Sequence, residues 1–348
     1  MKQFIIKSFI IIFPTLILFW NFSNYEISGG DLNRIGKISI EKDYRKIFEK
    51  EFTKTIRYKK PQQLDLKKEN NFDVVTIGDS FSLQKKYGYQ NSIAELGNLK
   101  ILSISDYNGE NPIEVLNSIV NGNLFEKLKT KYVILESVER SFAIRGMNIN
   151  KDNIVNIEDL RNIKTYDDNV KYKSKKKEIT LEIFQDRMKY FVYNLLYNFD
   201  EKAFMSKVYK VKLTKKLFST QKNELLFFEE DINNLIYSNE ENIVRLNKEL
   251  NLLSEKLEKK GVKLIVLPGP DKYDMYYDYI ENNKLPKNNF FEYMNEMPKK
   301  YIYINSKELL LKHIANGEKD IYFADDTHWS PYGVKIIVEE ILQKMALN

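Results

Sequence analysis

Residues 73–82 read DVVTIGDSFS, a short apolar run that ends in a glycine turn. The run is rich in β-branched residues, and the glycine with its polar followers stops it, which predicts a buried strand over 73–77. In open parallel sheets, ligands bind beyond the carboxyl ends of the strands. The turn therefore places Ser80 where such a sheet presents its binding edge.

Short apolar runs alternate with helix-compatible segments along the rest of the chain. Further strands are expected at 101–104, 132–135, 262–267 and 301–304. Helices are expected to begin at residue 111 and to span 240–260 and 333–345. Strands that alternate with helices pair in parallel and are covered on both faces. The sequence therefore predicts an α/β fold, a three-layer αβα domain with a mostly parallel central sheet.

Composition narrows the chemistry. The 348 residues contain no cysteine, and 43% are hydrophobic and 30% charged, which excludes disulfide-stapled and wholly disordered chains. Without a thiol, covalent catalysis must use a hydroxyl, a carboxylate or an amine. Apart from one histidine beside two aspartates, no group of metal ligands stands out, so we expect neither a metal nor a cofactor.

Residues 1–22 form an apolar stretch with Lys2 and Lys7 near its start. Its length is close to the ~20 residues that a helix needs to cross a bilayer, and no small-residue cleavage site follows it. We therefore expect a transmembrane signal anchor rather than a buried core helix. The positive-inside rule then places the main domain in the periplasm or outside the cell.

The remaining chain divides into three parts. Residues 23–69 are polar and basic and are expected to form a stalk that leads into the domain, which spans 70–348. An insertion at 145–235 breaks the strand–helix rhythm and contributes helices. Its stretch 171–222 is rich in lysine and aromatic residues, typical of a surface for anionic lipid or glycan, or of a solvated insertion. Outside the cytoplasm, we expect no nucleic-acid partner.

A serine nucleophile needs a base, and the chain has two histidines. His313 lies among apolar residues of an expected helix, where a packed or surface histidine is the simpler interpretation. His328 lies in a turn-rich loop shortly after Asp325 and Asp326. A carboxylate so close can hold the imidazole tautomer while the other ring nitrogen takes the serine proton. The alternative is that the aspartates are turn or N-cap residues and His328 is a surface side chain.

Together, Gly-Asp-Ser after the first strand and Asp-Asp-x-His before the last helix resemble the SGNH hydrolase superfamily over most of residues 70–345. The element Asp326-Thr-His-Trp329 is similar to the Asp-x-His-Trp element of the AlgJ and AlgX polysaccharide acetyltransferases. In those proteins this element precedes the serine, whereas here it follows, as in ordinary SGNH enzymes and in DltD. The resemblance implies that Ser80 is the nucleophile, His328 the general base and Asp326, or alternatively Asp325, its orienting carboxylate.

One block of the superfamily, Gly-x-Asn-Asp, is not recognisable after the strand at 132–135. The N–H groups that follow Ser80 could stabilise an oxyanion, and a second donor remains open among Asn108, Gly109 and Asn111. For Glu136 and Arg140 we expect either a buried ion pair that braces the site or a contact to substrate. For Lys272 the alternatives are a sugar contact and a loop cap.

The resemblance implies an extracytoplasmic O-acyltransferase that moves an acetyl group through Ser80 onto a hydroxyl of a polysaccharide acceptor. The donor would be a membrane-bound O-acyltransferase-type partner, and the N-terminal helix would hold the protein to the membrane. One alternative is a carbohydrate esterase or deacetylase with the same triad. Another is a non-catalytic membrane-anchored scaffold for polysaccharide assembly.

Overall fold

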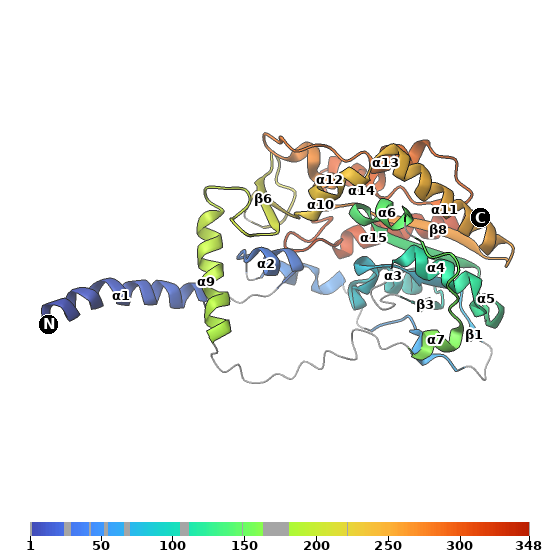
Figure 1. Ribbon diagram of the computed structural model, residues 1–348, viewed down its shortest axis with the longest axis horizontal. Coiled ribbons are helices and arrows are strands. Elements are labelled where there is room, and N and C mark those ends of the chain that lie inside the picture. Colours follow the sequence, from blue (N-terminus) through green and yellow to red (C-terminus); the bar gives the residue numbers. More distant parts are fainter. Residues whose placement is uncertain are drawn as a thin grey trace.

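A five-stranded parallel sheet forms the centre of the protein (Figure 1). The computed structural model describes residues 2–23, 29–41, 43–51, 55–65, 70–104, 111–147, 149–162, 181–220 and 222–347, with side chains omitted at 18–23 and 181–188. The strands run in the order β3 (Ile101–Ser103), β2 (Val74–Ile77), β5 (Tyr132–Val138), β8 (Lys263–Gly269) and β9 (Ile302–Tyr303). All five expected strands are present, and every neighbouring pair is parallel.

Alternate residues of each strand enter two different cores, as the two-residue period of a strand requires. Ile134 and Ile265 pack in one core, whereas their neighbours Val133 and Leu264 pack in the other. The first core is covered by α3 (Tyr89–Leu96), α14 (Ser306–Ala315) and α15 (Pro331–Leu347), and the second by α4 (Pro112–Asn121), α6 (Glu139–Met147), α11 (Glu240–Glu258) and α13 (Phe290–Glu296). The three-layer αβα architecture is therefore confirmed.

The strand order explains where a site can form. The chain passes from β2 to β3 on one side and then crosses to β5 on the other side of β2. Such a reversal leaves a crevice beyond the carboxyl ends of the two diverging strands, where ligands bind in open α/β sheets. Ser80 follows β2 directly, and Glu136 lies on β5, so both belong to this switch point.

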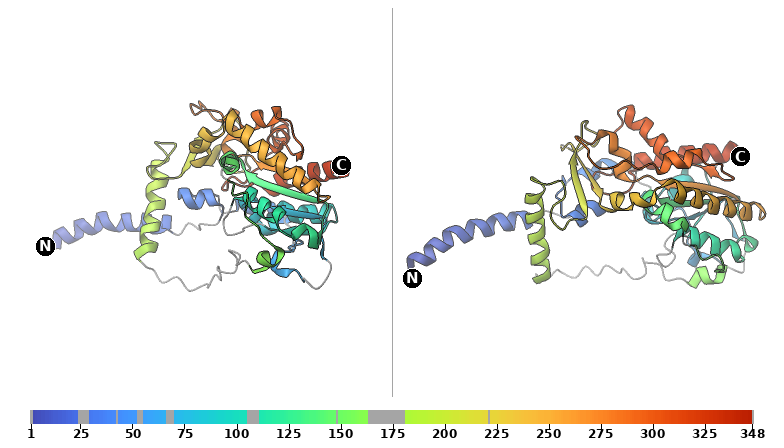
Figure 2. Two further views of the ribbon diagram at one scale, coloured as in Figure 1. Left: turned by 45° about the vertical axis from the view of Figure 1, so that its right-hand side comes forward. Right: turned by 45° about the horizontal axis from the view of Figure 1, so that its top comes forward.

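The first helix, α1 (Lys2–Ser23), projects from the body and contacts α9 (Leu181–Leu196), as all three views in Figures 1 and 2 show. A membrane span requires both length and apolarity, and none of the helices, as far as the structure describes them, combines the two. The expected transmembrane anchor is therefore not supported.

Much of the segment expected to be a stalk packs on the domain. It forms α2 (Asp31–Gly36), the 3-10 helix η1 (Tyr44–Glu51) and the short η2 (Pro61–Gln63). Tyr44 and Phe48 of η1 are both buried in the core, with their ring centroids 5.5 Å apart. We call residues 29–51 the N-terminal segment below.

The insertion contains α7 (Ile157–Asn162), α9, an antiparallel pair of β6 (Val208–Lys212) with β7 (Glu224–Phe228), and α10 (Glu230–Asn233). Its lysine-rich stretch at 173–177 lies outside the described residues. The remaining elements are short: β1 (Asn70–Asn71), η3 (Ser80–Leu83), η4 (Lys85–Tyr87), α5 (Leu124–Lys127), β4 (Leu128–Lys129), η5 (Asn234–Tyr237), α12 (Lys272–Tyr276) and η6 (Tyr277–Tyr279).

Candidate active site

Ser80 begins η3 at the carboxyl end of β2 and is half-buried. We call residues 78–82 the Ser80 turn. A Cβ on Gly78 would overlap Ser82 Oγ and Glu136 Oε2, so only glycine allows the backbone to approach β5 this closely. The sequence thus bends sharply at Gly78 and presents Ser80 at the sheet edge.

Asp79, just before Ser80, fixes the turn against β5 and α6. Its Oδ2 accepts a hydrogen bond from the N–H of Val138 at 2.9 Å and pairs with the guanidinium of Arg145. Burial alone would raise the pKa of Asp79, but the charge of Arg145 and the hydrogen bond from Val138 lower that pKa below its usual value. The carboxylate therefore stays ionised and holds the turn in place.

Glu136 braces the same turn from β5. Its Oε2 accepts hydrogen bonds from the N–H of Asp79 at 3.0 Å and from Ser82 Oγ at 2.8 Å. Burial, and then the charge of Asp79, raise the pKa of Glu136 well above its usual value. The expected ion pair of Glu136 with Arg140 is wrong. Arg140 lies at the start of α6 and pairs with Asp271 at 2.6 Å and with Asp231 at 3.3 Å.

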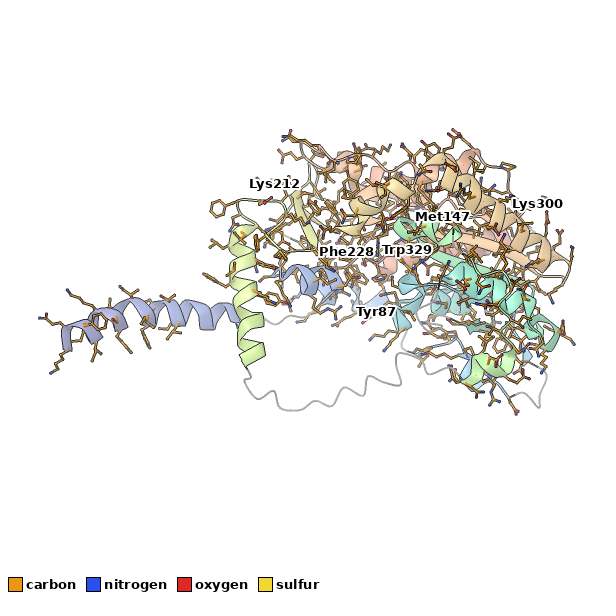
Figure 3. All side chains as sticks on the ribbon, in the orientation of Figure 1. Tyr87, Met147, Lys212, Phe228, Lys300 and Trp329 are labelled. Carbon is orange, nitrogen blue, oxygen red and sulfur yellow. The ribbon has the colours of Figure 1, made fainter. Side chains whose placement is uncertain are left out.

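His328 lies in the loop at residues 323–330, which leads into α15 and which we call the His328 loop. Its Nδ1 is 2.5 Å from Asp326 Oδ1. The imidazole packs against Phe81, the residue after Ser80, with 4.8 Å between the ring centroids. Trp329, the next residue, lies within the body of the molecule rather than at its rim (Figure 3). Hydrophobic contacts thus bring the His328 loop against the Ser80 turn.

The electrostatics of this pair suit a general base. Burial lowers the pKa of His328, but the carboxylates of Asp326 and Asp31 raise this pKa by more than burial lowers it, so the pKa lies above 6.5. Burial likewise opposes ionisation of Asp326, yet His328 and Arg45 hold the pKa of that carboxyl far below 3.8. In the part of the chain that the structure describes, the buried Nε2 of His328 has no hydrogen-bond partner. An imidazole held at Nδ1 leaves Nε2 for proton transfer.

Asp325 and Asp326, which the sequence left as alternatives, share Arg45 but otherwise have different partners. Asp325 forms a two-pronged ion pair with Arg45, at 2.9 Å from Nε and 2.7 Å from the terminal nitrogen, and accepts the N–H of Gly30 at 2.8 Å. A Cβ on Gly30 would overlap the Asp325 carbonyl oxygen. Geometry therefore favours Asp326 as the partner of His328, while Asp325 holds the N-terminal segment.

The N-terminal segment also supplies site residues that the sequence did not reveal. Asp31 accepts hydrogen bonds from the N–H of Thr327 at 2.8 Å and from its hydroxyl at 2.5 Å, and lies 3.9 Å from His328 Nδ1. Tyr44 accepts the N–H of Ala324 at 2.8 Å. No local motif marks these positions, because their partners lie at the other end of the chain.

Lys272 forms hydrogen bonds with the backbone of the His328 loop. Its Nζ donates to the carbonyl oxygens of Phe323 at 2.7 Å, Ala324 at 2.9 Å and Asp326 at 3.1 Å. Burial lowers the pKa of Lys272 to about 8, against the opposing charges of Asp325 and Asp326. Of the two expected roles, this geometry favours the loop contact over a sugar contact.

The oxyanion donors are only partly accounted for. Asn108 and Gly109 lie outside the described residues. Asn111 caps α4 through Oδ1, and its Nδ2 donates to the Arg145 carbonyl at 2.7 Å. The N–H groups after Ser80 are used within the turn: Phe81 donates to Asp79 Oδ1 at 3.4 Å and Ser82 to the Asp79 carbonyl at 3.0 Å. The expectation that these N–H groups face an oxyanion is therefore not supported.

Asp31, Asp326 and His328 place their potential ligand atoms within 4.8 Å of one another. These atoms already form hydrogen bonds with each other and with Thr327, so the cluster by itself does not indicate a cation site. The insertion has a cavity of about 370 Å³ between the end of α9 and the β6–β7 pair. None of its lining residues belongs to the Ser80 turn or the His328 loop.

The parallel αβα sheet carries the Ser80 turn and the His328 loop at its carboxyl edge, where the resemblance to SGNH-like proteins places the serine and the histidine. Residues 222–347, about a third of the chain, match the family described as "SGNH hydrolase-like domain, acetyltransferase AlgX". This match confirms the resemblance to SGNH-like proteins of the AlgX type. The matched segment includes the His328 loop and Lys272, whereas Ser80 precedes it. No curated protein and no solved structure gives a significant match.

Proposed function

We propose that this protein is a serine-dependent O-acetyltransferase that modifies a polysaccharide. The observation that carries the proposal is the state of His328: its Nδ1 is held by an ionised Asp326, its Nε2 is buried without a partner among the described residues, and its ring packs beside the Ser80 turn. This is the arrangement that a base needs in order to activate a hydroxyl.

The proposed reaction has two transfers. Ser80 Oγ attacks the acyl carbon of the donor and gives its proton to His328 Nε2, and His328 then protonates the leaving group as the bond to the donor breaks. In the second transfer a sugar hydroxyl attacks the acetyl–Ser80 ester, its proton passes to His328, and Ser80 Oγ recovers a proton as it leaves. Asp326 stabilises the imidazolium in both steps.

The acceptor, donor and location are parts of the same proposal. The polysaccharide acceptor is suggested by the AlgX-type match, and the acetyl donor would be a membrane-bound O-acyltransferase-type protein. We also propose that the domain works at the outer side of a membrane, which it contacts through α1. The exposed apolar side chains of α1, among them Phe4, Phe9, Ile10 and Ile11, support this contact.

The test compares two serines of one turn. Ser80→Ala should abolish release of acetate from a simple acetyl ester. For the unchanged protein we expect mass spectrometry to detect an acetyl adduct on the peptide containing residue 80, and this adduct should be absent from Ser80→Ala. Ser82→Ala is the matched control: Ser82 Oγ is engaged with Glu136 and Tyr89, so this variant should lose stability but keep the adduct. An adduct that persists in Ser80→Ala would refute the proposed nucleophile.

Two alternatives give different results in the same assay. An esterase or deacetylase would release acetate to water even when acetyl-accepting oligosaccharides are present, whereas a transferase would acetylate the sugar. A scaffold would show no turnover, and polysaccharide acetylation in cells would survive Ser80→Ala. For the location, protease added to intact cells should degrade the domain, and full protection would contradict the proposed side of the membrane.

A further inference from the structure

Five large apolar side chains are exposed on one part of the insertion. Val192, Leu195 and Phe199 are 40%, 51% and 83% exposed, and Phe204 and Met205 are 80% and 73% exposed. The first three follow a spacing of three and four residues, so they lie on one face along α9 and its last turn. Tyr190 and Tyr197 on the opposite face are buried, and Tyr197 packs in the small core that contains Leu32 and Val208. We call these five exposed residues the α9 patch.

The α9 patch is held by a fixed scaffold. The hydroxyl of Tyr197 donates to Ser206 Oγ at 2.5 Å and contacts the Val208 carbonyl at 2.8 Å, which ties the loop of Phe204 and Met205 to the end of α9. Burial raises the pKa of Tyr197 to about 12, so the hydroxyl keeps its proton. The N–H of Lys210 also donates to the Glu201 carbonyl at 2.8 Å, which closes the loop.

Lysines are frequent in the sequence that carries the α9 patch. Residues 189–216 contain seven lysines and two acidic residues, Asp200 and Glu201. Lys202 and Lys210 pair with acidic side chains, whereas Lys189, Lys207 and Lys212 are exposed. Figure 3 shows Lys212 at the edge of the body on the side of α9. An apolar stripe with a lysine rim matches the interface of an anionic lipid bilayer.

The position of α1 favours a lipid surface over a protein partner. α1 contacts α9, leaves the body from that end in every view, and exposes its own apolar side chains (Figures 1 and 2). A lipid surface that contacts α1 would therefore lie close to α9. α1 and α9 also run in clearly different directions in Figure 1, so contacts through both helices would restrict how the domain is oriented on that surface.

We propose that the α9 patch is a second membrane contact, which docks on an anionic lipid surface and fixes how the domain is oriented above it. The proposal rests on the membrane location proposed above, but not on the acyl-transfer chemistry. Each aromatic or aliphatic side chain of the patch would enter the interface between headgroups and acyl chains, and the lysines would contact the headgroups.

The lack of cysteine allows a site-specific test in the full chain. Phe204→Cys provides a single thiol for an environment-sensitive fluorophore, and Ile154→Cys, at a position 63% exposed beside α7, provides the control. With vesicles containing phosphatidylglycerol, the fluorophore at 204 should shift to the blue and become protected from an aqueous quencher. The fluorophore at 154 should not change, and neutral phosphatidylcholine vesicles should give a weaker response at 204.

A pair of charge variants provides a second measurement. Phe199→Glu should weaken partitioning into the anionic vesicles about tenfold, because it replaces an aromatic ring that would enter the lipid interface by a charge. Ile236→Glu, at a position 69% exposed outside the patch, should leave partitioning unchanged.

Three results would overturn the proposal in distinguishable ways. If the chain floats with vesicles but the fluorophore at 204 stays in water, the α9 patch does not touch lipid, while the membrane location survives. If the chain does not float, the membrane location fails as well. If the fluorophore responds only to membranes that retain their native proteins, the patch binds a protein. None of these readouts depends on Ser80.

Discussion

Asp325 and Asp326 are neighbouring carboxylates with different partners, and substitution should separate their roles. Asp326→Asn removes the charge that holds the imidazolium of His328, so kcat for an acetyl ester should fall by roughly three to four orders of magnitude. Asp325→Asn breaks the ion pair with Arg45 and should mainly lower the melting temperature. Equal losses of kcat in the two variants would contradict the assignment of Asp326.

The pKa shifts of His328 and Asp326 set the pH dependence. A general base must be neutral, so kcat/KM should rise with pH through a midpoint above 6.5, and Asp326→Asn should move that midpoint down. The raised pKa also means that protonated His328 stabilises the fold below pH 6.5, and this contribution is lost as pH rises through the folded pKa. The lowered pKa of Asp326 contributes stability above pH 3.8, which is lost as pH falls through its folded value. Ester kinetics and denaturant unfolding between pH 4 and 9 test the sign for His328, and denaturant unfolding below pH 3.8 tests the sign for Asp326.

Lys272 provides the third residue-scale prediction. Lys272→Met leaves three carbonyl oxygens of the His328 loop without their donor, so kcat should fall and the pH profile should change. Lys307→Met is a matched control, because Lys307 is also buried but pairs with Asp274 at 2.6 Å and does not bond the loop. It should lower stability with an unchanged pH profile. If both variants lose only stability, Lys272 does not position the base.

At the scale of elements, we expect η1 to affect both stability and kcat, because its Arg45 bonds the His328 loop. Arg45→Met removes the two-pronged bond to Asp325, and we expect a loss of about 2 kcal/mol in the free energy of unfolding together with reduced kcat. Its neighbour Lys46 pairs on the surface with Asp43, so Lys46→Met should change neither quantity measurably. Parallel urea titrations and ester assays of the two variants decide between these roles.

The elements that the sequence predicted are those with local signals. The strand before Ser80 follows from its β-branched run and the glycine after it, and the helix after Asn111 from its cap and proline. The role of η1 could not be predicted in this way, because the partners of Arg45 are Asp325 and Asp326, which lie 280 and 281 positions further along the chain. The sequence could not decide between Asp325 and Asp326 for the same reason. Both fit the local motif, and the bond of Asp325 to distant Gly30 is one of the contacts that distinguish their roles.

For the whole molecule, we expect the N-terminal segment to be part of the folding unit. A chain that begins at residue 29 retains Phe48 in the core and Asp31 at the His328 loop, and should keep ester turnover. A chain that begins at residue 55 loses both, and the loss of Phe48 alone should cost about 3–5 kcal/mol. Thermal unfolding and turnover of the two chains provide the test, and an active chain from residue 55 would contradict it.

The bond from Gly30 to Asp325 joins positions 295 residues apart. The ribosome therefore synthesises Gly30 at the start of translation and Asp325 almost at the end. Until the last stretch emerges, the Ser80 turn has no base beside it. If Ser80 is the nucleophile proposed above, a nascent chain, or one that a protease has shortened from its carboxyl end past His328, should not react with acyl donors, because the base is missing.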